Sequence, residues 1–170
     1  MDFKLKPISK TGIPEAISKV ELYRSLNEPE EAESICRDIL VADPHNQLAM
    51  RLLGLALTDQ FIGAASDRYA ETEQIFQSLS DPYERLYYSG LLCERRAKAQ
   101  LRAGHLPHTL LPLFEKAMHL FEEAEKIRPP DNDDALLRWN RCVRLLQSRL
   151  GSEWEKEYEM FEAHDSPPTG

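Results

Sequence analysis

The sequence contains few cysteines, and no spacing links them. Cys36, Cys93 and Cys142 are isolated and odd in number. A disulfide framework or a zinc site needs paired or clustered cysteines, so we interpret all three as small hydrophobic residues of a core. His105 and His108 form an H-x-x-H pair with no third ligand nearby in the sequence. We therefore expect neither a metal nor any other cofactor.

Catalytic motifs are also missing. The 170 residues contain no G-x-S-x-G, no glycine-rich phosphate loop and no H-E-x-x-H, and the seven glycines are scattered singly. His119, Glu122 and Glu123 form the most enzyme-like group. Lys116 and Lys126 flank them, however, which is typical of solvated pairs along the polar face of a helix. An enzyme or metal protein on a helical scaffold is therefore the least favoured interpretation, and we expect no catalytic residue.

Long hydrophobic runs are absent as well. No stretch of about 18 apolar residues could form a membrane span. The opening residues from Asp2 to Pro7 are charged and interrupted by proline, unlike the apolar segment of a signal peptide. We expect no membrane association and a cytoplasmic location.

Basic residues are too few and too dispersed for a nucleic-acid-binding surface. The net charge is −8, and it divides into −5 for residues 1–80, +2 for residues 81–150 and −5 for residues 151–170. Nucleic acid requires lysines and arginines clustered along the phosphate path. The composition therefore argues against nucleic acid, and it places most of the arginines in the second half of the chain.

What the sequence does contain is a helical pattern that recurs three times. Each copy places residues at i, i+4 and i+7 and ends on a proline: Ala32, Cys36, Ile39 and Pro44; Ala70, Gln74, Gln77 and Pro82; Ala117, Phe121, Ala124 and Pro129. The third copy is the clearest, because its apolar side chains share one helical face. In the second copy two glutamines occupy apolar positions, and Ile75, Phe76 and Leu79 form a better stripe. Such periodicity predicts an all-α solenoid of stacked repeats.

The pattern resembles the second helix of the tetratricopeptide repeat (TPR), and parts of the first helix are present too. Leu53-Gly54-x2-Leu57 is similar to L-G-x2-Y, Trp139 begins a segment with first-helix spacing, and Tyr23 lies where the first-helix tyrosine belongs. The resemblance implies an α-α superhelix of helical hairpins over residues 13–150. Its units would span about 13–46, 47–84 and 85–131, with a partial unit at 132–150.

The remaining segments are expected to flank or interrupt these units. Residues 1–12 would form an N-terminal arm, and insertions are expected near 61–65 and 103–107, the second after a long helix from about Tyr83 to Arg102. Gly151-Ser152 can end one helix and cap the next. We therefore predict a C-terminal capping helix at 151–163 and a disordered tail at 164–170.

The resemblance also implies that the first helices of the hairpins line a concave groove. The expected groove residues are Ile17, Glu21, Arg24, Arg51, Leu55, Asp59, Arg96, Asn140, Arg141 and Arg144. Arginines there would suit bidentate binding of carboxylates, so an acidic peptide or helix of another protein is the expected ligand. The alternative is that the arginines only form the solvent-exposed face of an amphipathic helix. The lysine, asparagine and arginine clamp that some TPR proteins use to bind chaperone tails is absent.

The C-terminal segment supports a further alternative. Trp154, Tyr158 and Phe161 recur at i, i+4 and i+7 among glutamates. They would either cap the solenoid or occupy a groove. In the groove of the same copy they would be autoinhibitory, and in the groove of another copy they would form a homodimer. The favoured function is a non-enzymatic protein–protein interaction module or adaptor. A small chaperone for a secreted substrate and a self-associating structural subunit remain as alternatives.

Overall fold

The structure, a computed structural model, describes residues 3–63 and 66–164, and it describes side chains up to Gly151 except at 66 and 67. Within these residues the chain is all-helical and forms no strand. The helices are η1 Lys10–Gly12, α1 Ile13–Ser25, α2 Pro29–Ala42, α3 Gln47–Asp59, α4 Ser66–Gln77, α5 Pro82–Arg102, η2 Pro107–Leu110, α6 Leu111–Lys126 and α7 Asp134–His164. None of them has both the length and the apolar character needed to cross a membrane.

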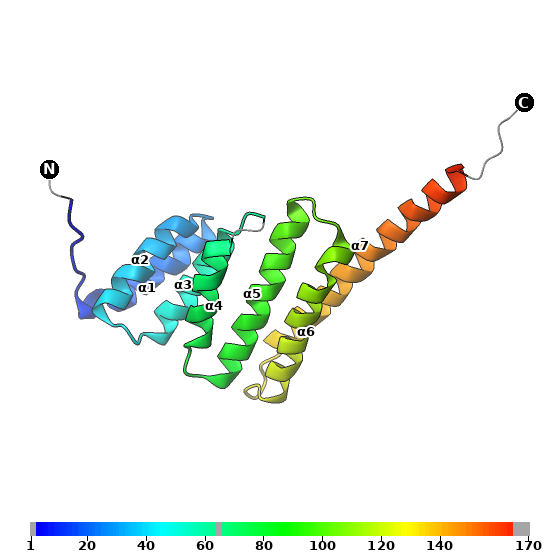
Figure 1. Cartoon of the computed structure of the whole chain (residues 1–170). Helices are drawn as coiled ribbons and strands as arrows, with labels where there is room; N and C mark the ends of the chain where they lie inside the picture. The colour runs from blue at the N-terminus through cyan, green and yellow to red at the C-terminus, as the bar shows by residue number, and fades with distance from the viewer. Residues whose placement is uncertain (1–2, 64–65, 165–170) are drawn as a thin grey trace, which may run out of the picture.

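The α-helices pack in the order of the sequence. Each contacts the next one, and α1, α3, α5 and α7 also contact one another in that order. Figure 1 shows the resulting row of helices, from which the distal part of α7 projects beyond α6. The expected all-α architecture of neighbouring helices is confirmed.

Local signals in the sequence set the ends of several helices. Pro29 and Pro82 are the first residues of α2 and α5, where a missing backbone N–H removes no helical bond. The side chain of Asn46 accepts a hydrogen bond from the backbone N–H of Ala49 at 3.0 Å and so caps α3. Asp81 caps α5 in the same way. These signals separate the hairpins by short turns, which keeps consecutive helices side by side.

The even-numbered helices bury equivalent faces. The buried triplets are Ala32, Cys36 and Ile39 from α2; Thr72, Phe76 and Leu79 from α4 and its end; and Ala117, Phe121 and Ala124 from α6. Two of the large rings lie against glycines of the preceding helix, Phe76 against Gly54 and Phe121 against Gly90. The same contact therefore recurs in two successive hairpins, with a small residue on the first helix and a ring on the second.

The register predicted for the second copy of the pattern is wrong by two residues. Ala70, Gln74 and Gln77 are exposed, whereas the triplet that begins at Thr72 is buried. The reason is that Pro82 does not correspond to the other two prolines. Pro44 and Pro129 lie in turns after α2 and α6, but Pro82 is already the first residue of α5. Because the three copies were aligned on their prolines, the pattern assigned the wrong face of α4 to the core.

The predicted helix boundary at Gly151-Ser152 is also wrong. The backbone of α7 is continuously helical from Asp134 to His164, so there is no separate capping helix at 151–163. A glycine within a helix costs only about 1 kcal/mol relative to alanine, and this does not force a break. The side chains of Trp154, Tyr158 and Phe161 and the tail at 165–170 lie outside the described residues.

The cysteines lie in the core, as expected. Cys36, Cys93 and Cys142 are all buried and free. Burial raises the pKa of Cys36 and of Cys142 to about 12 and also raises the pKa of Cys93, because the thiolate loses its hydration. All three remain neutral thiols at physiological pH and pack as small hydrophobic side chains.

A candidate anion-binding cavity

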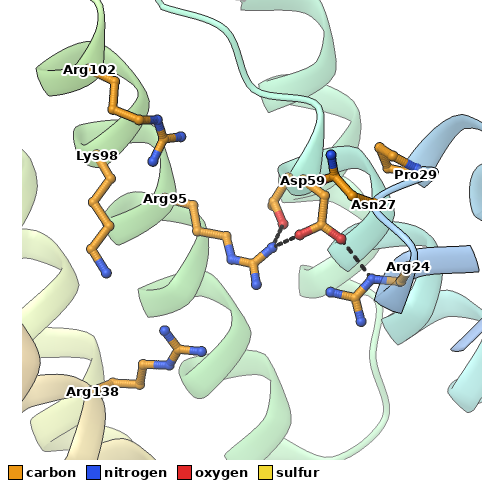
Figure 2. Close-up of a pocket in the computed structure, with 9 residues that line it drawn as sticks. Arg24, Asn27, Pro29, Asp59, Arg95, Lys98, Arg102 and Arg138 are labelled. Atoms are coloured by element: carbon orange, nitrogen blue, oxygen red, sulfur yellow. Dashed lines mark hydrogen bonds and ion pairs between the residues drawn. The ribbon is translucent and has the colours of Figure 1, made fainter. Parts of the chain in front are cut away.

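A cavity of about 330 Å³ opens where the ends of α1 and α3 meet the last turns of α5 and the start of α7 (Figure 2). We call it the cationic cavity, since its lining has five basic side chains and one carboxylate. It is lined by Arg24, Asn27, Pro29, Thr58, Asp59, Arg95, Lys98, Arg102 and Arg138. Three helices far apart in the sequence, α1, α5 and α7, thus place positive charge around one space, and α3 adds the carboxylate.

Helical geometry explains why these side chains converge. On α5, Arg95, Lys98 and Arg102 follow at i, i+3 and i+7, which places them on one face of the helix. Arg24 lies in the last turn of α1, and Asp59 is the last residue of α3. The carboxyl ends of helices carry partial negative charge, which favours an arginine there.

Asp59 holds two of the arginines. Its Oδ2 atom accepts a hydrogen bond of 2.8 Å from Nε of Arg24, and its Oδ1 atom accepts one from Nη1 of Arg95. The same Nη1 also donates to Oγ1 of Thr58 at 2.7 Å. Burial lowers the pKa of Arg95, and the carboxylate of Asp59 opposes that effect. Asp59 therefore fixes the guanidinium groups of α1 and α5 relative to α3.

Glu94 interacts with two other cations of the cavity lining, Lys98 and Arg138. Its side chain is fully buried and pairs with Lys98 one turn later, and Oε2 lies 3.6 Å from Nη1 of Arg138. Burial lowers the pKa of Arg138, but the charge of Glu94 and a hydrogen bond with Tyr87 outweigh this and raise it. The Oε2 atom has no hydrogen-bond partner. The buried carboxylate thus orients two cations toward the cavity.

The cationic cavity keeps a surplus of positive charge. Asp59 and Glu94 provide two carboxylates for five cations, which leaves a formal charge of +3. Within the described part of the chain, Arg102 makes no ion pair or hydrogen bond through its side chain. In Figure 2 its guanidinium group, the ammonium group of Lys98 and the guanidinium group of Arg138 border the same space. The arrangement can bind an anion without first breaking all of its internal ion pairs.

Of the ten groove residues expected from the sequence, Arg24 and Asp59 line the cationic cavity. Arg51 lies elsewhere and donates to Glu84 of α5 at 2.7 Å. Leu55 is half-buried against the core between α5 and α6, and Ile17 is half-buried in the core of α1 to α3. The other predicted residues on α1 and α7 line no part of the cavity: Glu21, Arg141 and Arg144 are exposed, and Asn140 is half-buried.

The position of Arg96 differs most from the expectation. Its guanidinium carbon lies 4.2 Å above the centre of the Tyr69 ring, on the side of α5 that faces α4. The cavity side of α5 carries Arg95 instead. One residue rotates a side chain by about 100° around a helix, so a register error of one residue exchanges these two surfaces.

Sequence reasoning missed Arg95, Lys98, Arg102 and Arg138. The i, i+3, i+7 spacing of the first three was a usable signal, because it marks one basic face on a helix predicted to be long. No comparable signal identified Arg138, since its place depends on how α7 docks against α5 and α6.

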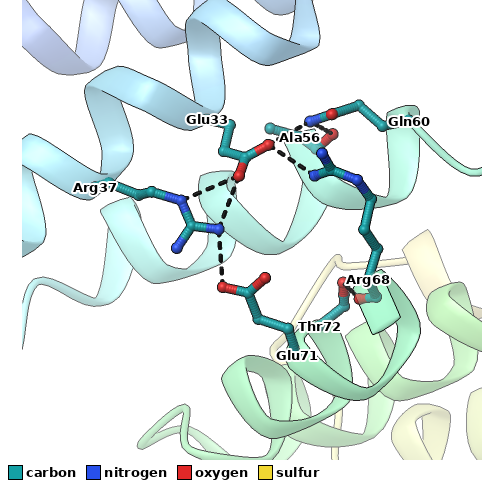
Figure 3. Close-up of polar contacts among 7 residues, drawn as sticks. All are labelled: Glu33, Arg37, Ala56, Gln60, Arg68, Glu71 and Thr72. Carbon is teal, nitrogen blue, oxygen red and sulfur yellow. Dashed lines mark hydrogen bonds and ion pairs between the residues drawn. The ribbon is translucent and has the colours of Figure 1, made fainter. Parts of the chain in front are cut away.

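A second polar network joins α2, the end of α3 and α4, and it has a different character (Figure 3). Glu33 accepts hydrogen bonds from Arg37 at 2.7 Å, from Arg68 at 2.9 Å and from Gln60 at 2.7 Å. Arg37 also donates to Glu71 at 2.8 Å. Burial raises the pKa of Glu33, but these hydrogen bonds outweigh it and lower the pKa overall. Its charges are paired internally, so this network joins helices and is not a candidate site.

One group of residues in the described part of the chain has the geometry to hold a metal ion. His119, Glu122 and Glu123 place ligand atoms within 4.8 Å of one another on the surface of α6. His119 and Glu122 are exposed, and Glu123 pairs with Lys126. This is the ordinary arrangement of a polar helical face, and it lies on another helix than those that line the cationic cavity.

No family model, no curated protein and no solved structure matches this chain. The class that the observations define is therefore an all-helical protein of sequence-adjacent helices with a cationic cavity. Any finer assignment depends on the residues of this chain alone.

Proposed function

We propose that the chain is a tetratricopeptide-like solenoid that acts as a protein–protein interaction module. Three features support the solenoid: successive helical hairpins, the contacts between alternate helices α1, α3, α5 and α7, and the glycine–ring contact that recurs in two hairpins. In such a solenoid the first helices of the hairpins form one continuous surface. The cationic cavity lies on that surface, since its basic residues come from α1, α5 and α7 and its carboxylate from α3.

The ligand that this surface fits is an acidic segment of another protein. The observation that carries the proposal is the surplus charge of the cationic cavity, in which five cations face two carboxylates. Arginine binds carboxylates in a planar, bidentate geometry that lysine lacks, and four of the five cations are arginines. This arrangement supports recognition of a peptide with the arginines as hot spots.

The test is a binding measurement with matched charge variants. A fluorescent peptide of four consecutive glutamates is titrated with the intact chain at low salt, and its anisotropy is recorded. The double variant Arg102→Gln, Arg138→Gln should bind at least about tenfold more weakly, because each hydrogen bond to a charged group contributes about 1.5–3 kcal/mol. The variant Arg141→Gln, Arg144→Gln should bind like the wild type.

This control also removes two positive charges, both from exposed positions of α7 outside the cavity. Equal weakening by both variants would show that the peptide senses only net charge, which would contradict the proposal. Circular dichroism of each variant verifies that the helices remain folded.

A second candidate, self-association, is favoured by one observation. The helix α7 continues through Gly151 and projects past the rest of the molecule in Figure 1, where it can contact another copy. Light scattering on the intact chain and on a chain ending at Leu150 separates the alternatives. Loss of a dimer on truncation would support self-association, and a monomer in both cases would remove it.

A further inference from the structure

The charge of the cationic cavity exceeds what one carboxylate can neutralise. A single carboxylate would leave a formal charge of +2 in a partly enclosed space, whereas a phosphate dianion would leave +1. A phosphate also presents three terminal oxygens in a tetrahedral arrangement, so it can accept hydrogen bonds from several directions at once. The cations that border the cavity come from three helices and approach from different sides (Figure 2).

The donors that remain available fit this geometry. Arg102 makes no ion pair or hydrogen bond through its side chain in the described part of the chain. Arg24 uses Nε for Asp59, and Arg95 uses Nη1 for Thr58 and Asp59, which leaves other guanidinium N–H groups of both residues for a ligand. Arg138 stays 3.6 Å from Glu94, beyond ordinary hydrogen-bond distance. Four guanidinium groups therefore retain donors beside one cavity.

A second cavity continues from the first. It measures about 390 Å³ and shares Asn27, Pro29 and Asp59 with the cationic cavity. Its other walls carry no surplus of positive charge, since they consist of Glu30, Arg68, Gln60 and the exposed apolar side chain of Ile62. Walls without surplus positive charge suit the residues that flank a phosphorylated side chain, whereas a free phosphate ion gains nothing from this extension.

We propose that the cationic cavity binds the phosphate of a phosphorylated side chain in an extended peptide of a partner protein, with neighbouring residues of that peptide in the second cavity. This inference deepens the proposed function and depends on it, because it names the acidic group that the interaction module recognises. Glu94 is a positioning residue in this account, since it holds Lys98 and Arg138 beside the space that the phosphate would occupy.

The test uses three immobilised peptide libraries that differ only at one fixed central position, which is phosphoserine, glutamate or serine. The flanking positions are degenerate, so no sequence need be known. Binding of the intact chain should be at least about tenfold stronger to the phosphoserine library than to the glutamate library, because the second charge of the dianion and its extra acceptor oxygens add hydrogen bonds to charged donors. The serine library should not bind.

Two variants place the binding in the cavity. Arg102→Gln should lower binding to the phosphoserine library at least about tenfold, since it removes a guanidinium group with no structural partner. Arg144→Gln, an exposed arginine of α7, is the matched control and should leave binding unchanged. Titration of the intact chain with inorganic phosphate, followed by calorimetry, supplies the comparison with a free anion and should show binding at least about tenfold weaker than that of a selected phosphopeptide.

The outcomes distinguish failure of the phosphate inference from failure of the proposed acidic-peptide function. Equal binding of the phosphoserine and glutamate libraries would overturn the phosphate inference and leave the acidic-peptide function standing. Binding of inorganic phosphate as tight as that of the phosphopeptide would overturn the assignment to a peptide. Absence of binding to both charged libraries would contradict the inference and the proposed function together.

Discussion

Gly90 of α5 lies directly against the ring of Phe121 of α6. A methyl group at Gly90 would be 2.8 Å from Cε1 of Phe121 and 3.2 Å from the backbone oxygen of Ala117. Phe121 is completely buried, so its ring has little room to move away. The two helices can approach this closely only because position 90 has no side chain, and α6 in turn supports the helix that carries Arg138.

This contact predicts the effect of a small substitution. Gly90→Ala should destabilise the protein by about 1–2 kcal/mol, because overpacking outweighs the gain in helix propensity. Gly151→Ala is the control, since nothing lies within 4 Å of its added methyl group, and it should raise stability by up to about 1 kcal/mol. Chemical denaturation followed by circular dichroism measures both. A neutral Gly90→Ala variant would show that the helices are less tightly packed than described.

The buried carboxylate of Glu94 should be important for stability as well as for charge placement. Glu94→Gln should lower the free energy of unfolding by about 2 kcal/mol, less than for a fully buried pair because Lys98 and Arg138 are partly exposed. The control is Glu123→Gln on the surface of α6, which should not change the melting temperature. A Glu94→Gln protein as stable as the wild type would mean that the buried charge is not compensated as described.

Acid should weaken the network around Glu33. Its pKa is lowered in the folded protein from the ordinary value of 4.5, so Glu33 contributes stability above pH 4.5 that is lost as the pH falls through the folded-state pKa. Glu33→Gln should therefore be less stable than the wild type at neutral pH, and the difference should shrink below pH 4.5. Thermal melts across this range measure the difference. A constant difference at all pH values would exclude Glu33 as the group that titrates.

The three thiols should be unreactive in the folded protein. Burial raises the pKa of Cys36 and Cys142 to about 12 and also raises that of Cys93, and only the thiolate is a strong nucleophile. A colourimetric thiol reagent at pH 8 should label none of them in buffer and all three in denaturant. Rapid labelling of one cysteine without denaturant would indicate local opening of its helix pair.

The helical architecture was predictable because its signals are local. Apolar spacing around Ala117 and Phe121 and the prolines at helix starts act within one or two turns, so the all-α class and most helices follow from them. The repeat register of α4 was wrong because Pro82 begins α5, although Phe76 and Leu79 of the stripe predicted there are buried. The continuity of α7 was missed because a glycine that can end a helix does not have to.

The candidate site was less predictable, for a geometric reason. Arg24 and Asp59, which the sequence predicts side by side, do line one cavity, because α1 and α3 have the length of the repeat pattern. On the longer α5 the expected residue was Arg96, but Arg95 faces the cavity and Arg96 contacts Tyr69. Arg138 could be found only from the packing of α7. Side chains that converge from several helices depend on angles that no single segment encodes.

Arginine side-chain resonances offer the most direct test of the cationic cavity. The protein is labelled with ¹⁵N, its arginine Nε–H signals are assigned with single Arg→Lys variants, and the tetraglutamate peptide is titrated. The account predicts shifts for Arg95, Arg102 and Arg138 and none for Arg141 and Arg144. Shifts confined to Arg141 and Arg144, or no shift at a saturating peptide concentration, would contradict it.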